Sequence, residues 1–146
     1  MVEIKNILCA VDFAEMSPQV AAYAQSLAKC LNADVHVVFV ASTLERYRHF
    51  DVPAASFQNL ADKIAEESEK KMDRFIQDNF NIPNVKGKIL KGYADEEILN
   101  YARKENIDLI ILGTYGKKKM DRLFFGSVAE KVVKASEIPV MTIRPK

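Results

Sequence analysis

The sequence is poor in the residue types that build disulfide scaffolds and protein-bound metal sites. It has two cysteines, no tryptophan, two histidines and five glycines among 146 residues. Two cysteines are too few for a disulfide framework or a zinc cluster, so we expect Cys9 and Cys30 to be reduced thiols in the core. His36 and His49 have no partner at metal-ligand spacing, so we expect no metal held by the protein itself.

The chain also lacks an excess of charge and a long apolar run. Its 21 basic and 20 acidic residues give a formal net charge of +1, which provides no general attraction to nucleic acid or to an anionic membrane. No apolar stretch approaches the roughly 18 residues of a membrane span, and the N-terminus lacks the layout of a secretory signal. With 49% hydrophobic and 28% charged residues, the composition indicates a globular fold. We therefore expect one cytoplasmic domain over residues 1–146.

Two common phosphate-binding motifs are missing. The Walker A pattern G-x-x-x-x-G-K-[ST] does not occur, and neither does the dinucleotide pattern G-x-G-x-x-G. The turn after the first predicted strand, residues 12–16, contains no glycine. A P-loop nucleotide hydrolase and a hydride-transferring dehydrogenase are therefore both disfavoured.

Strand-like and helix-like segments alternate along the whole chain. The apolar runs predict strands over 4–11, 35–41, 85–91, 107–112 and 139–144. Helices are expected from Ser17 to Asn32, over 57–78, from Asp95 to Asn106 and over 126–135, with Ser17 and Asp95 as N-caps. The alternation predicts a parallel sheet with helices on both faces, and the mixed polarity of 85–91 places that strand at an edge.

One loop gathers three of the five glycines, Gly113, Gly116 and Gly126. Glycines let backbone N–H groups approach an anion, and Gly126-Ser127 opens a helix whose dipole attracts negative charge. Lys117–Lys119 add positive charge, or form a solvated loop tip. This pattern predicts a cradle for nucleotide phosphates. Two structural alternatives remain open: Ser127 and Glu130 fit a capping box, and Asp12 fits either a helix cap or a ligand-binding carboxylate at the end of a strand.

The spacing G-x-x-G, nine residues, then G-S resembles the ATP-binding signature of the universal stress protein family. Residues 10–13, 108–112 and 138–143 match as well, so the resemblance covers essentially the whole chain. It implies a single open five-stranded parallel sheet of Rossmann-like order 3-2-1-4-5, and a homodimer paired through 139–144. The implied ATP-binding residues are Ala10, Asp12, Val40, Leu112, Gly113, Gly116, Gly126, Ser127 and Val128.

Within that set, the resemblance places Asp12 at the ribose or adenine edge and Val40 at the adenine. It places Leu112 and Gly113 along the ribose, and Gly116, Gly126, Ser127 and Val128 at the phosphates. Magnesium or manganese would arrive with the triphosphate. The function so implied is that of an ATP-binding stress-response or signalling protein.

Two other functions stay open at the level of sequence. One is a slow ATPase, although no general base is evident near the glycine loop and we assign no catalytic residue. The other is a dimeric interaction scaffold whose nucleotide site stays empty.

Overall fold

The computed structural model describes residues 1–41, 54–115 and 126–145, without the side chains of residues 54, 55 and 57. The strands are β1 (Asn6–Ala10), β2 (Asp34–Ala41), β3 (Val85–Lys91), β4 (Leu109–Gly113) and β5 (Val140–Ile143). The helices are α1 (Ser17–Leu31), α3 (Ala54–Asn79), α4 (Ala94–Lys104) and α5 (Ser127–Ala135). All recorded strand pairs are parallel, in the order β3-β2-β1-β4-β5, so the predicted topology and the edge position of 85–91 are confirmed.

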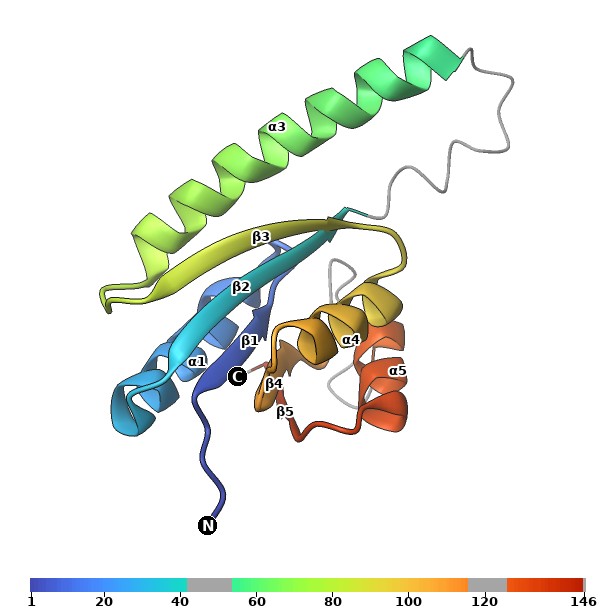
Figure 1. The fold of residues 1–146 in the computed structure, drawn as a ribbon. Helices are drawn as coiled ribbons and strands as arrows, with labels where there is room; N and C mark the ends of the chain where they lie inside the picture. The colour runs from blue at the N-terminus through green and yellow to red at the C-terminus, as the bar shows by residue number, and fades with distance from the viewer. Residues whose placement is uncertain (42–53, 116–125, 146) are drawn as a thin grey trace.

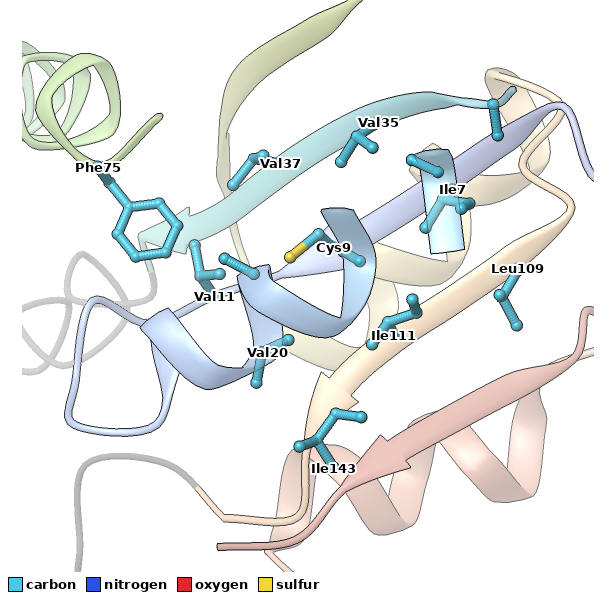
Figure 2. Packing of buried hydrophobic residues seen from close by; sticks show 14 of the residues in the cluster. Ile7, Cys9, Val11, Val20, Val35, Val37, Phe75, Leu109, Ile111 and Ile143 are labelled. Carbon is cyan, nitrogen blue, oxygen red and sulfur yellow. The ribbon is translucent and has the colours of Figure 1, made fainter. Parts of the chain in front are cut away.

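Helices cover both faces of this sheet, which explains why its central strands are apolar at nearly every position (Figure 1). On the α1 and α3 face, Figure 2 shows Val20 and Phe75 packed among the side chains of the strands. Alternate residues such as Leu8 and Val38 face α4 and α5 instead. Residues that follow one another in a strand are therefore buried in two separate clusters, because strand side chains alternate between faces.

Two helix starts differ from the sequence prediction. The N-cap of α1 is Met16, and Ser17 is the first helical residue, so Ser17 is not the cap. Tyr93 holds the N-cap position of α4, and Asp95 lies in its first turn, where a carboxylate still favours the positive end of the helix dipole. The predicted stops hold: Asn32 and Asn106 both adopt left-handed backbone conformations just beyond α1 and α4.

Helix α3 begins at Ala54, three residues before the predicted start at Phe57. Its C-terminal half packs on β3, where a Cβ built on Gly87 would collide with the side chain of Met72. Met72 and Phe75 are buried as predicted, whereas Leu60 near the other end is exposed.

The prediction of two core thiols is half wrong. Cys9 is buried in β1, but Cys30 is exposed on α1. Burial raises the pKa of the Cys9 thiol to about 12, so that thiol stays protonated at neutral pH. Among the described residues, no helix is both long and apolar enough to cross a bilayer.

Candidate functional site

The candidate site of the described structure lies at the carboxyl ends of the central strands. The chain leaves β1 toward β2 on one side, while β4 pairs with β1 on the other. Loops diverge at such a reversal and leave a crevice between them. A cavity of about 360 Å³ occupies this place, within the range of roughly 300–1,000 Å³ that is usual for small-molecule sites.

All the predicted site residues in the described ranges line this one cavity. They are Ala10, Asp12, Val40, Leu112, Gly113, Gly126, Ser127 and Val128. Gly116 lies outside the described residues, as do Lys117–Lys119. The structure therefore brings together residues that stand more than a hundred positions apart in the sequence.

Asp12 lies in the tight turn that joins β1 to α1. Its Oδ1 accepts hydrogen bonds from the backbone N–H of Ala14 at 2.9 Å and from the hydroxyl of Ser17 at 3.0 Å. To the described residues, Oδ2 makes no hydrogen bond. Of the two alternatives left open for Asp12, the helix cap is wrong, because Met16 holds the N-cap position of α1 and Asp12 Oδ1 is bonded within the loop before it. One oxygen of the carboxylate is therefore bonded within the loop, and the residue as a whole lines the cavity.

The N-terminus of α5 forms another wall of the cavity. Its first intrahelical bond runs from the N–H of Glu130 to the carbonyl of Gly126. The N–H groups of Ser127, Val128 and Ala129 therefore have no acceptor inside the helix. These residues also line the cavity, so the positive end of the helix dipole lies at its wall. This arrangement suits an anion such as a phosphate.

The proposed capping box is absent. Helix α5 has Gly126 as its N-cap, with no side-chain hydrogen bond to the helix start. Glu130 pairs with Lys134 at 2.8 Å instead of reaching back. Ser127 is exposed, and its hydroxyl does not cap the helix. Helix capping therefore does not explain the serine at this position.

Gly126 has a structural reason to be glycine. Its N–H donates to the carbonyl of Thr114, and a Cβ at this position would lie 2.8 Å from that carbonyl oxygen. Gly113 is less constrained, since its nearest neighbours would be 3.5 Å away. The close approach of the α5 N-terminus to the end of β4 therefore requires glycine at 126, whether or not a ligand is present.

The remaining wall is apolar. Val38 and Val40 of β2, Ile98 of α4 and Leu112 of β4 contribute to it. Even-numbered residues of β2 direct their backbone groups toward β1, as the bond from Val11 N–H to Val38 O shows. Pairing with β1 ends at Val38, so the backbone N–H and C=O of Val40 face the open space beyond β1. A flat, polar-edged ring such as a purine suits this combination of apolar walls and free backbone groups.

The cavity is also lined by residues outside the predicted set, among them Ala94 and Ile98. Both belong to the start of α4, just after β3. They are apolar, so no polar or glycine motif in the sequence marks them. The general rule that ligands lie beyond the carboxyl ends of strands would have pointed to residues 92–94 as well.

A buried polar pair lies on the same face of the sheet as α4. His36 Nδ1 and the Tyr101 hydroxyl are 2.8 Å apart, and both side chains are buried. Burial, with help from the charge of Lys86, lowers the pKa of His36. Burial also raises the pKa of Tyr101. Both groups are therefore neutral at pH 7, and neither lines the cavity.

The sheet order, the helices on both faces and the cavity at the strand reversal define a Rossmann-like α/β protein with a cavity at the switch point of its sheet. The model of the universal stress protein family matches residues 3–144. The chain belongs to the universal stress protein family.

Individual relatives agree with this assignment. Universal stress protein MJ0531 of Methanocaldococcus jannaschii is 27% identical over 143 residues, which are 96% of this chain and 82% of that protein. The solved structure of hypothetical protein MJ0577 is 28% identical, with a TM-score of 0.84 and 99% coverage of both chains. Universal stress protein UspA from Lactobacillus plantarum is 27% identical, with a TM-score of 0.81 and coverage of 99% and 100%.

Proposed function

We propose that this protein belongs to the nucleotide-binding members of its family, that it holds ATP in the cavity between β1 and β4, and that it serves in stress response or signalling. The proposal takes residues 1–146 as one binding domain. One observation carries it: a single cavity joins the α5 N-terminal amides that have no acceptor inside the helix, the Asp12 carboxylate and an apolar wall. Phosphates, ribose hydroxyls and a purine ring have the matching chemistries.

Each part of the ligand has a counterpart in the chain. The amides of Ser127 and Val128 would donate to the phosphates, and Gly116 stays a predicted neighbour of them. Asp12 would accept a hydrogen bond from a ribose hydroxyl, and Val40 would offer its backbone to the adenine edge. A bound triphosphate would bring magnesium or manganese with it, since the described residues contain no cluster of three or more metal-ligating side chains.

Two solved universal stress proteins were obtained with adenine nucleotides, one in complex with cAMP and one, from Archaeoglobus fulgidus, in complex with dAMP. They are 15% and 17% identical to this chain, with TM-scores of 0.64 and 0.65. At these identities the likeness is one of fold. The complexes therefore describe those proteins, and the choice of ATP for this chain rests on the resemblance of its glycine signature, with the cavity as support.

Binding is favoured over turnover by the composition of the cavity wall. Asp12 is the only carboxylate among the described residues that line the cavity, and one of its oxygens already accepts two hydrogen bonds. A hydrolase would need a base that orients water at the γ-phosphate. Asp12 would lie at the ribose, with the α- and β-phosphates between it and the γ-phosphate.

Thermal unfolding with and without ATP–Mg²⁺ tests the proposal. A ligand at about 100 times its Kd stabilises the fold by about 2.7 kcal/mol. For a chain of this size that raises Tm by roughly 8 °C. Inorganic triphosphate and adenosine should each give a smaller shift, because each fills part of the site. No rise in Tm at millimolar ATP would refute nucleotide binding and favour the empty scaffold.

A second measurement identifies the natural occupant. Mass spectrometry of the denatured, freshly purified protein should release an adenine nucleotide. Gly116→Val should release none, because a side chain at that glycine would fill the predicted phosphate seat. If this variant still releases nucleotide, Gly116 is not part of the binding site.

The homodimer also belongs to the proposal. Strand β5 ends the described sheet, so one of its edges lacks a partner strand, and Met141 on it is exposed. Pairing with a second copy across a two-fold axis would satisfy that edge. Light scattering should give twice the chain mass, and Thr142→Pro, which removes a backbone donor, should give the monomer. The cytoplasmic location stays a prediction from sequence.

A further inference from the structure

The loop between β1 and α1 is built around the Asp12 carboxylate. The hydroxyl of Ser17 donates to Asp12 Oδ1 at 3.0 Å and accepts the backbone N–H of Asp12 at 3.3 Å. The N–H of Ala14 adds a second bond to the same Oδ1 at 2.9 Å. Three hydrogen bonds thus fix one carboxylate oxygen and the backbone that carries it.

Ser17 is committed to this role. Its side chain is 2% exposed, and a hydroxyl has a single hydrogen to donate, which goes to Asp12. Although Ser17 belongs to the cavity wall, it has no donor left for a ligand. Its position at the first residue of α1, where the sequence predicted a helix cap, is explained by Asp12 rather than by the helix.

Phe13 holds the other side of the loop. Its backbone is left-handed, with φ of 60°, a conformation that aromatic residues rarely adopt. The ring stacks on Phe39 of β2, with centroids 4.7 Å apart and planes inclined by 27°. The ring also meets Phe75 of α3 edge-on at 5.7 Å. Two aromatic contacts from separate elements therefore hold the residue next to Asp12 in an unfavourable backbone conformation.

Building on the proposed nucleotide site, we propose that Ser17 and Phe13 are positioning residues that lock Asp12 Oδ1 so that Oδ2 is presented to a ribose hydroxyl. A carboxylate fixed before binding loses no side-chain freedom when the ligand arrives. The α3 helix takes part through Phe75, although Phe75 does not line the cavity.

The discriminating experiment compares the Kd of ATP with that of 2′,3′-dideoxy-ATP by calorimetry. A hydrogen bond to a charged carboxylate is worth about ten- to hundredfold in affinity, so the parent should prefer ATP by at least tenfold. Ser17→Ala should reduce this preference to below about threefold, while the Kd for the dideoxy compound changes little. Phe75→Leu should also reduce the preference for ATP. Substitution of a residue with only a structural role would instead weaken the binding of both compounds equally.

Two control variants isolate the effect. Ser26→Ala removes an exposed hydroxyl from the same helix, α1. Ile107→Val destabilises the opposite core cluster, away from the Asp12 loop. Both should keep the parent preference for ATP, which separates loss of positioning from general loss of stability.

Failure of this inference differs from failure of the proposed function. A parent protein that binds neither compound refutes the nucleotide site itself, and the positioning role with it. A parent that binds both compounds equally keeps the nucleotide site and overturns the positioning role. If folded Ser17→Ala and Phe75→Leu both retain the parent preference, the clamp around Asp12 has no part in recognition.

Discussion

The substitution Gly126→Ala tests the closest contact of the candidate site. The new Cβ would lie 2.8 Å from the Thr114 carbonyl oxygen and 3.1 Å from the Tyr115 Cα. Both neighbours are backbone atoms, so α5 and the end of β4 must separate by about half an ångström to reach ordinary contact. Overpacking of this kind costs about 1–3 kcal/mol, and the hydrogen bond from residue 126 to Thr114 weakens as well. The expected fall in Tm is roughly 3–9 °C.

Gly113→Ala is the matched control. Its Cβ would meet Met16 and Tyr115 at 3.5 Å, which is ordinary contact, so stability should change by less than about 1 kcal/mol. Differential scanning calorimetry of the two variants without nucleotide measures how much stability the added Cβ costs at each position. The same scans with ATP–Mg²⁺ should show a smaller ligand-induced rise for Gly126→Ala, because the α5 amides have moved. Equal melting temperatures for the two variants would refute the steric reasoning.

Other predictions concern groups outside the site. Burial lowers the pKa of His36 in the folded protein, so the unfolded chain binds more protons at mildly acidic pH. The contribution of His36 to the free energy of unfolding is therefore complete above the unfolded pKa near 6.5 and is lost as the pH falls through the lower folded pKa. Urea unfolding between about pH 7 and about pH 5 should show a slope of at most about 1.4 kcal/mol per pH unit, which His36→Phe should remove. A thiol reagent should label Cys30 in the native protein but Cys9 only after unfolding, and rapid native labelling of both would contradict the burial of Cys9. Gly87→Ala should lower the free energy of unfolding by about 1–3 kcal/mol, because the new Cβ would collide with the side chain of Met72. An unchanged urea midpoint would show that α3 can shift away from β3 without loss of stability.

Several features followed from local sequence because their causes are local. Continuous apolar runs indicated the buried strands, and the mixed polarity of 85–91 indicated an edge strand. A strand covered on both faces needs apolar residues at nearly every position, whereas a partly exposed strand does not. Asn32 and Asn106 ended helices because asparagine tolerates the left-handed conformation needed there. The strand order itself came from the family resemblance, because local patterns do not say which parallel strands pair.

Parts of the site were predicted for incomplete reasons. Gly126 was assigned to phosphate approach, yet its neighbour is the Thr114 carbonyl. Ser17 was assigned to helix capping, yet its hydroxyl bonds to Asp12. In both cases the residue type was informative, but the partner lies on another segment or across a turn, which spacing alone does not reveal.

The sequence by itself determined the alternation of strands and helices, the glycine-rich helix start and the presence of a carboxylate after the first strand. Only the tertiary structure decided that these features meet at one cavity, that Ala94 and Ile98 close its wall, and that one oxygen of Asp12 is already bonded. The physical reason is that helix and strand patterns are set by neighbours within a few residues. A cavity is set by the register and crossing of elements that the chain brings together from far apart.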